Sequence, residues 1–504
     1  MTSLYARMAA RFPDPEKTFL KTVDGRDLTY GDLQARSAQM AAALTGLGVE
    51  PGDRVAVQVQ KSPEALMLYL ACTRAGAVYL PLNTAYTLAE IGYFIGDAEP
   101  AVVVCDPKSR DAIAALPEAA GVRSVETLDA AGRGSIVDLS AGRPESFDDV
   151  ARADDDLAAI LYTSGTTGRS KGAMLTNDNL ASNAEVLCDY WRFTSDDVLI
   201  HALPIYHTHG LFVATNVVLM TGGAMWFLPK FDADTVLELM PQATAMMGVP
   251  TFYTRLIDHP GLTRDVAGKM RLFTSGSAPL LAETHRAFED RTGHRILERY
   301  GMTETNMSTS NPYDGERRAG TVGFPLPGVD LRIVDAETGK ELPQGEIGII
   351  EVRGPNVFKG YWRMPEKTEA EFRPDGFFIT GDVSFVDADG YVHIVGRAKD
   401  LIISGGFNVY PKEVESEIDD LQGVVESAVI GVPHRDFGEG VTAVVVREAG
   451  AAIDEAAVQA ALKDRLAAYK LPKRVFFVDA LPRNTMGKVQ KNVLRETYEK
   501  TYTG

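Results

Sequence analysis

The sequence predicts an α/β protein with a large N-terminal domain and a small C-terminal domain. At 504 residues the chain is longer than one hydrophobic core usually serves. Short apolar runs alternate with helix-like segments through most of the first two thirds of the chain, a pattern typical of parallel sheets covered by helices. The pattern then changes to strands and turns, and finally to a mixed segment. We therefore expect two doubly wound α/β subdomains, a β-rich subdomain and a small α+β domain.

The first doubly wound subdomain is expected at residues 18–150. Pro63 stands at the first turn of a helix-like segment, a position that proline favours because its missing N–H is not needed there. Residues 107–152 are rich in Ala, Gly and acidic residues and show weak periodicity, so they predict a surface excursion. The predicted elements are strands at 55–59, 78–82 and 101–105 and a helix at 63–74.

The same alternation resumes after residue 172 and predicts a second doubly wound subdomain. From Gly320 to about Arg397, strands alternate with Gly- and Pro-containing turns, which predicts the β-rich subdomain. The predicted strands lie at 198–202, 224–228, 243–247 and 271–275 in the α/β part, and at 330–335 and 346–353 in the β-rich part.

The domain boundary is predicted at Arg397, so that residues 1–397 form the large domain and residues 398–504 the small one. A segment of about a hundred residues is long enough to fold on its own. An amphipathic helix is expected near its end, with Val458, Leu462, Leu466 and Tyr469 on one face. The other predicted elements are strands at 401–403, 424–432 and 441–447 and a helix at 411–420.

The composition of the chain limits the kinds of molecule that it is expected to bind. The formal net charge is −18 and the pI is about 5.0, which argues against a broad surface for nucleic acid or for an anionic membrane. No apolar run approaches the ~20 residues that a membrane span needs. Cys72, Cys105 and Cys188 have no partner at metal-ligand spacing, and so few cysteines predict buried thiols in a reducing compartment. These features predict a cytoplasmic protein that binds small molecules.

A loop of glycines, hydroxyls and cations has the sequence TSGTTGRSKG at residues 163–172. Glycines let backbone N–H groups turn toward an anion, hydroxyls add donors, and Arg169 and Lys171 supply positive charge. The spacing differs from that of a Walker A loop, in which four residues separate the first glycine from Gly-Lys-Ser/Thr. The alternative is a flexible surface connection. The buried-type strand before the loop and the absence of acidic residues within it favour phosphate binding.

This loop resembles the phosphate loop of the adenylate-forming superfamily, which includes acyl-CoA synthetases, luciferases and the adenylation domains of peptide synthetases. Four further blocks of that superfamily follow in the expected order. They read ERYGMTE at 298–304, TGD at 380–382, GRAKD at 396–400 and NTMGK at 484–488. The resemblance extends over essentially the whole chain, and it implies an adenylation domain followed by a mobile domain that pivots at Lys399.

The resemblance implies a reaction in two steps that uses ATP, Mg²⁺ and coenzyme A. A carboxylate first attacks the α-phosphate of ATP to give an acyl-adenylate and pyrophosphate, and the thiol of coenzyme A then displaces AMP. This chemistry needs a clamp for three phosphates, a divalent cation and a positive charge near the α-phosphate. In the superfamily, the C-terminal domain presents different faces to one site for the two steps.

The resemblance also assigns roles to residues. Asp382 would accept hydrogen bonds from both ribose hydroxyls, Tyr300 would lie against adenine, and Lys488 would reach the acid and the α-phosphate. The predicted catalytic residues are His207, Thr303, Glu304 and Lys488, and the predicted Mg²⁺ ligands are Thr167 and Glu304. The predicted nucleotide and coenzyme A contacts are Thr163, Ser164, Gly165, Thr166, Thr167, Lys171, Ser277, Ala278, Glu298, Tyr300, Gly301, Met302, Asp382, Arg397, Lys399, Gly405 and Gly406.

Arg299 bears on which acid is used, because it stands where many fatty-acyl and aryl relatives carry a small neutral residue. A buried arginine is costly unless a carboxylate meets it. A dicarboxylic acid would meet it, with its distal carboxylate on Arg299 and with His209 and Ser277 as further donors. The alternative is that Arg299 pairs with Glu298 or another internal acid. This region and residues 203–210 resemble the malonyl-CoA synthetases, which implies malonate as the substrate.

Other functions stay open at this point. The same chemistry on methylmalonate or another short acid is one, and transfer to a carrier protein in place of coenzyme A is another. A serine hydrolase using Ser164, Ser275 or Ser277 is a third, although none of these serines lies in Gly-x-Ser-x-Gly. A nucleotide-binding regulatory protein without catalysis is a fourth. A lysine acetyltransferase or deacetylase acting on Lys488 is a further predicted partner, because one lysine would control the first step.

Overall fold

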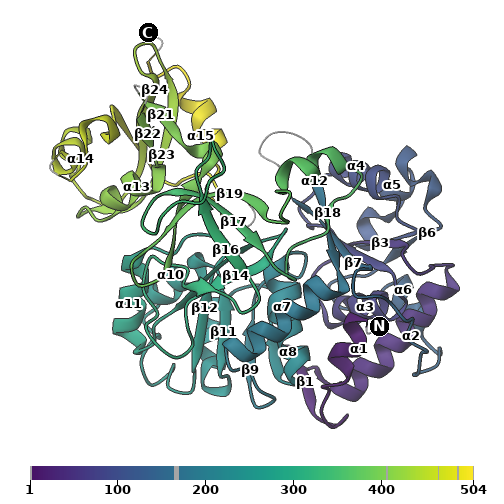
Figure 1. Cartoon of the computed structure of the whole chain (residues 1–504). Helices are drawn as coiled ribbons and strands as arrows, with labels where there is room; N and C mark the ends of the chain where they lie inside the picture. Colours follow the sequence, from purple (N-terminus) through teal and green to yellow (C-terminus); the bar gives the residue numbers. More distant parts are fainter. Residues whose placement is uncertain (1–2, 164–169, 405–406, 464, 485–486, 503–504) are drawn as a thin grey trace. The chain divides into compact units, whose positions relative to one another are not determined.

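The computed structural model describes residues 3–163, 170–404, 407–463, 465–484 and 487–502. The chain divides into two compact units, each a mixture of helices and sheets, as predicted for an α/β protein (Figure 1). The predicted boundary at Arg397 and the pivot at Lys399 remain predictions. Unit 1 comprises Met1–Ala319, Pro325–Asp330 and Arg353–Gly376, and unit 2 comprises Gly320–Phe324, Leu331–Val352 and Phe377–Gly504.

The first sheet of unit 1 corresponds to the first predicted doubly wound subdomain. Its strands are β3 (Arg54–Gln58), β4 (Val78–Pro81), β5 (Val102–Cys105), β6 (Ser124–Thr127), β7 (Leu157–Thr163), β8 (Lys171–Thr176) and β18 (Gly360–Tyr361). The helices of this part of the chain are α2 (Tyr30–Gly46), α3 (Pro63–Arg74), α4 (Leu88–Ala98), α5 (Arg110–Ala114), α6 (Ser135–Ser140) and α12 (Pro365–Glu371). The strand order is β18-β8-β7-β4-β3-β5-β6, and the strands from β7 to β6 run parallel. The predicted strands and helix of this sheet are found with ends within one residue of those expected.

Three strands of this sheet, β6, β8 and the two-residue β18, were not predicted. Strand β6 lies in residues 107–152, which were expected to be a surface excursion. Its sequence, SVET, is short and mostly polar, and its pairing with β5 rather than its periodicity makes it a strand. Strand β8 pairs antiparallel with β7, so the predicted phosphate loop connects two strands of a hairpin before helix α7 begins.

The second sheet of unit 1 confirms the second doubly wound subdomain. Its elements are α1 (Leu4–Ala9), β1 (Thr18–Lys21), β2 (Asp27–Thr29), α7 (Asn177–Tyr190), β9 (Val198–His201), a π-helix (His209–Thr215), α8 (Asn216–Thr221), β10 (Ala224–Phe227), α9 (Ala233–Leu239), β11 (Ala245–Gly248), α10 (Pro250–Asp258), β12 (Leu272–Ser275), α11 (Ala282–Thr292), β13 (Leu297–Met302) and β14 (Asn306–Ser310). The strands follow the order β14-β13-β12-β11-β9-β10-β1-β2, and those from β13 to β1 run parallel.

Helix α7 lies between the two sheets, because it contacts β7 and β8 of the first and β14 of the second (Figure 1). Its N-terminus is fixed by a capping box. The Thr176 side chain accepts a hydrogen bond from the N–H of Asn179, and the Asn179 side chain accepts one from the N–H of Thr176. The helix therefore begins at a defined residue after the β7–β8 hairpin.

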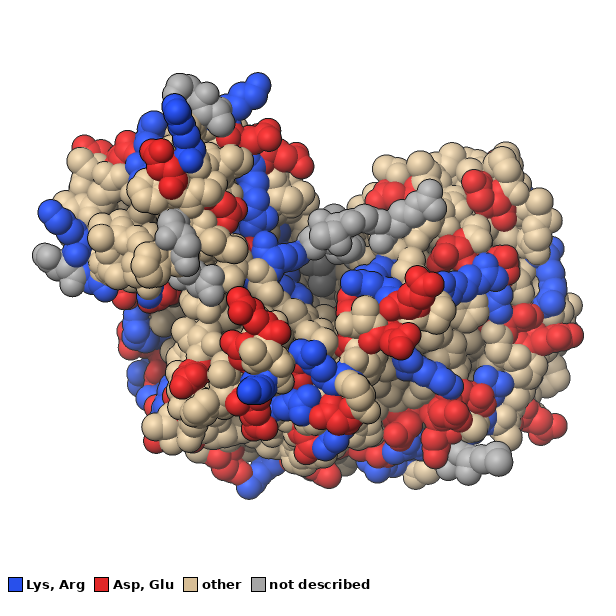
Figure 2. Space-filling view, turned by 45° about the horizontal axis from the view of Figure 1, so that its top comes forward, with Lys and Arg blue, Asp and Glu red and all other residues tan. Residues whose placement is uncertain are grey.

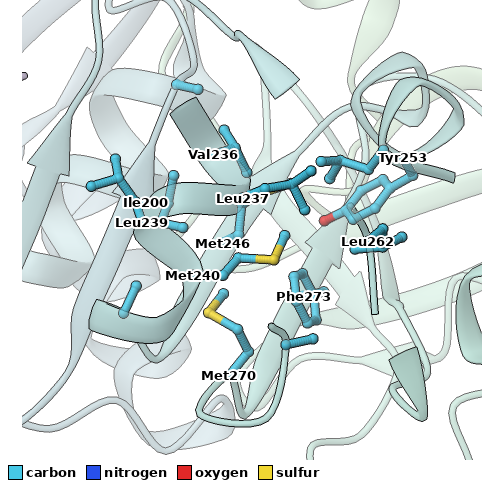
Figure 3. Packing of buried hydrophobic residues seen from close by; sticks show 14 of the residues in the cluster. Ile200, Val236, Leu237, Leu239, Met240, Met246, Tyr253, Leu262, Met270 and Phe273 are labelled. Atoms are coloured by element: carbon cyan, nitrogen blue, oxygen red, sulfur yellow. The ribbon is translucent and has the colours of Figure 1, made fainter. Parts of the chain in front are cut away.

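An apolar core packs against β9, β11 and β12 (Figure 3). Ile200, Met246 and Phe273 come from these strands, and Tyr253 comes from α10. All four side chains are fully buried. The hydroxyl of Tyr253 donates to the carbonyl of Thr274 at 2.5 Å, which fixes the carboxyl end of β12. The core thus holds rigid the strand ends that carry the predicted acid-binding residues.

Unit 2 contains two further sheets, with the orders β16-β17-β19-β20 and β22-β21-β24-β23, and β25 pairs with β24. Helix α13 packs on β23, and its residues Val414 and Ile418 join Val429, Val441 and Val458 in one apolar cluster. The strands of unit 2 are β16 (Asp330–Val334), β17 (Gly348–Arg353), β19 (Phe378–Val386), β20 (Val392–Arg397), β21 (Ile402–Ser404), β22 (Phe407–Val409), β23 (Val424–His434), β24 (Gly438–Arg447) and β25 (Arg474–Val478). The helices of unit 2 are α13 (Pro411–Asp419), α14 (Glu455–Leu462) and α15 (Lys491–Tyr498).

The predicted amphipathic helix of unit 2 is shorter than expected. Val458 and Leu462 are buried on one face of α14, which ends at Leu462. Leu466 and Tyr469 also pack against the apolar cluster, but they reach it from beyond the helix, where residues 468–470 form a 3₁₀ turn. The helical spacing of the apolar residues therefore predicted correctly which residues contact the core, but it predicted a helix that is too long.

The surface carries charges of both signs. Figure 2 shows Lys and Arg side chains interspersed with Asp and Glu side chains over the face in view. Cys72, Cys105 and Cys188 are buried free thiols, as predicted. Among the helices of the described residues, none has the length and hydrophobicity that crossing a lipid bilayer requires.

The ion pair between Asp197 and Arg271 is expected to stabilise unit 1. Asp197 is buried, and its carboxylate accepts hydrogen bonds from Arg271 at 2.6 and 2.7 Å and from Thr244 at 2.7 Å. Burial opposes ionisation of Asp197, but these hydrogen bonds outweigh burial and hold its pKa below the usual value. Asp197→Asn should therefore destabilise unit 1 by about 3 kcal/mol at pH 7, measured as a lower Tm in calorimetry.

The matched control is Asp330→Asn, which breaks an exposed pair with Arg353 in the same unit and should cost less than about 1 kcal/mol. Because the folded pKa of Asp197 is depressed, its contribution is complete above the unfolded pKa of about 3.9 and is lost as the pH falls through the folded value. Equal losses of Tm in the two variants would contradict this account.

Candidate active site

The predicted acid-binding residues gather at the carboxyl ends of neighbouring parallel strands. Strand β9 ends at His201 and leads into the segment with His207 and His209, β12 ends at Ser275 and leads to Ser277, and β13 carries Arg299. Strands β9, β11, β12 and β13 are consecutive in the sheet. Ligands of open α/β sheets bind at this edge.

Arg299 is the most unusual side chain of this group, because only 3% of it is exposed. Its Nε and Nη2 atoms have no hydrogen-bond partner among the residues that the structure describes. Burial lowers the pKa of Arg299 to about 9, which the neighbouring Tyr253 partly opposes, so the guanidinium is still charged at pH 7. A charged, buried group with unused donors fits an anionic ligand.

The alternative pairing of Arg299 with Glu298 is not observed among the described residues. The two are consecutive residues of β13, so their side chains point to opposite faces of the sheet. Glu298 is buried, and its backbone carbonyl accepts hydrogen bonds from the N–H and the side chain of Asn311. The strand geometry therefore separates the carboxylate from the guanidinium.

Gly276 and Ser277 shape the space around Arg299. A Cβ atom at Gly276 would lie 2.0 Å from Nη1 and 2.3 Å from Cζ of Arg299, so only glycine lets the guanidinium lie here. Ser277 has a φ of +70°, a left-handed conformation that is uncommon outside glycine and is found at functional sites. The chain turns sharply after β12 and presents the Ser277 hydroxyl to His209, while the half-buried Ala278 follows.

His209 and His207 are neutral at pH 7. The hydroxyl of Ser277 lies 3.2 Å from Nδ1 of His209, and Nε2 of His209 has no hydrogen-bond partner in the described chain. Burial, followed by the positive charge of Arg299, lowers the pKa of His209 well below its usual value. Burial lowers the pKa of His207 to about 4, and its buried Nε2 is also without a described partner.

The Tyr-Gly-Met-Thr-Glu block crosses from β13 toward β14. Gly301 is required, because a Cβ there would lie 1.8 Å from the carbonyl oxygen of Asn306 on β14. Tyr300, Met302 and Thr303 are half-buried, and Glu304 is buried. The tight turn thus places a hydroxyl and a carboxylate, the types expected for an α-phosphate contact and for Mg²⁺, next to each other.

A network of four side chains joins the predicted phosphate loop to Glu304. The hydroxyl of Tyr361 lies 3.0 Å from Glu304 Oε1 and 2.6 Å from Glu371 Oε2. Lys171 donates to Glu371 at 3.2 Å and lies over the ring of Tyr361, 4.1 Å from its centroid. The lysine expected to bind phosphate is therefore paired with Glu371.

The phosphate loop itself lies partly outside the described residues. Thr163 ends β7 and pairs with Lys171 at the start of β8, so the two described ends of the loop lie side by side. The predicted contacts Ser164, Gly165, Thr166 and Thr167 fall in the part that is not described, and so do Gly405 and Gly406 of the predicted coenzyme A contact.

Unit 2 brings Asp382, Arg397 and Lys488 together. Asp382 on β19 is paired with Arg397 on β20, and its carboxylate accepts a hydrogen bond from Arg397 Nε at 2.7 Å. Arg397 also donates to the carbonyl of Thr380 at 3.1 Å. Loss of hydration, followed by the charge of Arg397, lowers the pKa of Lys488, and Asp382 opposes this shift. A carboxylate and two cations therefore lie close to one another, as a nucleotide site requires.

The predicted pivot, Lys399, lies in the 3₁₀ turn Ala398–Asp400 that follows β20. Asp400 is bound to Arg495 of α15 at 2.6 Å. The turn is thereby linked to the helix that ends unit 2. Its role as a hinge remains a prediction.

Sequence reasoning missed two residues that contact this site, Tyr361 and Glu371, and it did not identify the contact that makes Gly276 necessary. Gly276, Tyr361 and Glu371 act through neighbours that are distant in sequence, Arg299 in the first case and Lys171 in the other two. A glycine after a buried strand and an acid in a short helix are common features with many explanations. Their relevance follows only from the strand order and from the packing of α12.

His207 is expected to make stability depend on pH. Its folded pKa of about 4 lies below the unfolded value of about 6.5, so the unfolded chain binds the proton first as the pH falls. The stability that His207 contributes is present above pH 6.5 and is lost toward pH 4, by a total of the order of 3 kcal/mol. His207→Gln should flatten the fall of Tm between these two pH values, and an unchanged slope would contradict the neutral, buried imidazole.

Comparison with known proteins agrees with this geometry. Residues 6–362 match the family described as AMP-binding enzyme, and residues 413–488 match the AMP-binding enzyme C-terminal domain. The chain is 66% identical to MatB from Rhodopseudomonas palustris, whose ATP-bound crystal structure matches it with a TM-score of 0.98 over 100% of both chains.

More distant relatives act on different acids. A feruloyl-CoA synthase from an Amycolatopsis species is 38% identical over 94% of both chains. A malonate–CoA ligase from Arabidopsis thaliana is 34% identical over 94% of this chain and 85% of that protein. The two matches to the family extend over most of the chain. The chain belongs to the AMP-binding enzymes of the adenylate-forming superfamily.

Proposed function

We propose that the chain joins malonate to coenzyme A with ATP, through a malonyl-adenylate, and releases AMP and pyrophosphate. The observation that carries the choice of acid is Arg299, a buried guanidinium whose Nε and Nη2 have no partner among the described residues. The distal carboxylate of malonate supplies the missing acceptor. His209 and Ser277 lie beside it as further polar contacts.

The charge of the pocket favours a diacid over a neutral aromatic acid. The feruloyl-CoA synthase is more similar in sequence than the plant malonate–CoA ligase, so overall identity does not decide the substrate. A feruloyl group would leave the guanidinium desolvated and unpaired, which costs several kcal/mol. Methylmalonate carries the same two carboxylates with one more methyl group, and it is the second candidate.

In the first step, a carboxylate oxygen of malonate attacks the α-phosphorus of ATP, and pyrophosphate leaves. Arg299 orients the acid through its other carboxylate, so that the reacting oxygen is held in place. Lys171 binds the phosphates after exchanging Glu371 for them, and Thr303 donates to the α-phosphate. Lys488 supplies positive charge where negative charge develops. Glu304 and Thr167 are the residues that would hold Mg²⁺, which would neutralise phosphate charge.

In the second step, the sulfur of coenzyme A attacks the malonyl carbonyl carbon, and AMP leaves with the bonding electrons. The thiol proton needs an acceptor, and His207 is a neutral imidazole whose buried Nε2 has no described partner. Gly405 and Gly406 would admit the pantetheine arm after rotation at Lys399. Asp382 would hold the ribose, with Arg397 beside it, through both steps.

The hydrolase alternative lacks an essential part of its machinery. Ser277 does lie 3.2 Å from His209, as in a serine–histidine pair. A triad also needs a carboxylate on the other ring nitrogen. Nε2 of His209 has no such partner among residues 3–163, 170–404, 407–463, 465–484 and 487–502. Regulation by acetylation of Lys488 and a cytoplasmic location remain predictions.

The acid panel is the direct test of this proposal. AMP release from ATP and Mg²⁺ should be fastest with malonate, then with methylmalonate, and slow with succinate, acetate, octanoate and benzoate, and it should need coenzyme A for multiple turnover. Arg299→Ala should lower kcat/KM for malonate by more than about 100-fold, because a buried charge loses its partner. It should change the rate with acetate far less.

The outcomes separate the parts of the proposal. If acetate or octanoate is preferred, the adenylation chemistry holds but the diacid pocket is wrong. Activity with a carrier protein and none with coenzyme A would change the acceptor. Product formation without ATP would support hydrolysis or another class of reaction.

Gly276→Ala tests the position of Arg299 without changing any charge. The added methyl group would overlap the guanidinium, so Arg299 has to move away from the acid. The KM for malonate should rise by about tenfold or more, the loss expected for one misplaced charged hydrogen bond. Gly121→Ala is the matched control, because a Cβ there meets no atom within 4 Å. Equal KM values for malonate in the two variants would contradict the assigned geometry.

A further inference from the structure

Lys61 is a second cation near the acid pocket, half-buried in the structure, and the sequence did not single it out. It lies between β3 and α3. Its Nζ lies 2.9 Å from His201 Nδ1, 2.8 Å from the carbonyl oxygen of His201 and 2.8 Å from that of Leu203. It also lies over the ring of Phe227, 4.2 Å from the centroid. Lys61 thus joins the first sheet of unit 1 to the carboxyl end of β9.

The contacts of Lys61 fit the charged ammonium group. An ammonium has three N–H donors and no acceptor, and Nζ has three acceptors at hydrogen-bond distance. Phe227 adds a cation–π contact. No carboxylate among the described residues lies within ion-pair distance of Lys61. Loss of hydration lowers the pKa of Lys61 well below its usual value, whereas the three acceptors and the ring of Phe227 favour the charged form without an opposite charge.

The Lys61 contact also fixes the tautomer of His201. Because Nδ1 accepts from Lys61, the proton of the neutral ring is on Nε2, which donates to the carbonyl of Gly210 at 2.8 Å. Thr215 donates to the same carbonyl at 2.9 Å. A chain of hydrogen bonds therefore runs from Lys61 through His201 to Gly210.

This chain holds both ends of one segment. Leu203 is bound to Lys61 directly, and Gly210 is bound through His201. The segment closes on itself, since a Cβ at Gly210 would lie 2.0 Å from the carbonyl oxygen of Pro204. His207 and His209 lie on the segment between these two fixed ends. Their positions depend on where Lys61 and His201 hold the backbone.

We propose that Lys61 is a positioning residue which, through His201, fixes residues 203–210 and sets the acid pocket for a dianionic substrate. The inference rests on the proposed function and deepens it, because it adds a determinant of acid binding that does not touch the acid. A neutral residue that only filled the space would not hold Leu203 and His201 together. Lys61 holds the segment without introducing a carboxylate that would compete with the substrate.

The test compares Lys61→Met with the parent chain in AMP release. The KM for malonate should rise by about tenfold or more, while the KM for ATP changes by less than about threefold. A general loss of structure would affect both KM values, because both substrates use Ser277, which follows β12, and residues of β13. Lys21→Met is the matched control, since it removes a partly exposed lysine from the same unit and should leave both values unchanged.

Two further variants keep the test decisive if Lys61→Met does not fold. Lys61→Arg keeps the charge and the donors and should retain more malonate affinity than Lys61→Gln. His201→Phe removes both ring nitrogens and should raise the KM for malonate as Lys61→Met does.

The inference is overturned if Lys61→Met raises the KM values for malonate and ATP equally, or leaves both unchanged. It is also overturned if Lys61→Arg and Lys61→Gln are alike. A parent chain that releases no AMP with malonate would instead refute the proposed function, so the two failures are distinguishable.

Discussion

The site depends on a buried positive charge that no described carboxylate neutralises. Removing a guanidinium from water costs several kcal/mol, and the lowered pKa of Arg299 reflects that cost. A protein group of opposite charge would relieve it, but β13 directs Glu298 to the other face of the sheet. The unused donors of Arg299 therefore remain for a ligand. A ligand with a second carboxylate matches this requirement in both charge and geometry.

The described residues around Arg299 leave its positive charge without a protein carboxylate. Gly276 leaves room for the guanidinium, and burial keeps His207 and His209 neutral, so that they add polar contacts and little charge. Lys61 is held by carbonyl oxygens and one imidazole. The phosphate side of unit 1 is arranged differently, because Lys171 is already paired with Glu371. In the proposed reaction, the substrate would supply an acceptor for Arg299, whereas phosphate would replace Glu371 at Lys171.

The sequence predicted most of the fold where apolar runs are long and bounded by turn residues. The strands at β3, β4 and β5 and the helix α3 are of this kind. Strand β6 was missed because its residues are mostly polar, and the helix that ends at Leu462 was drawn too long because later apolar residues reach the same core from a turn. In both cases tertiary contacts, which local periodicity does not contain, decided the outcome.

The residues of the candidate site were likewise predictable only where the sequence carries a local signal. Arg299 was identifiable because it stands where many fatty-acyl and aryl relatives carry a small neutral residue, and the blocks around Glu304, Asp382 and Lys488 were identifiable by their resemblance to a superfamily. The contribution of Gly276 depends on the neighbouring strand, and that of Lys61 depends on a contact across 140 positions in the sequence. Such contacts become visible only when strand order and register are known.

The most direct measurement is a crystal structure of the chain with a non-hydrolysable analogue of malonyl-adenylate. The account predicts that the distal carboxylate lies within about 3 Å of Arg299 Nε and Nη2, the spacing of a charge-assisted hydrogen bond. His209 and Ser277 should border the same carboxylate. A distal carboxylate that points to solvent or to another cation, with Arg299 paired to a protein carboxylate, would contradict the account.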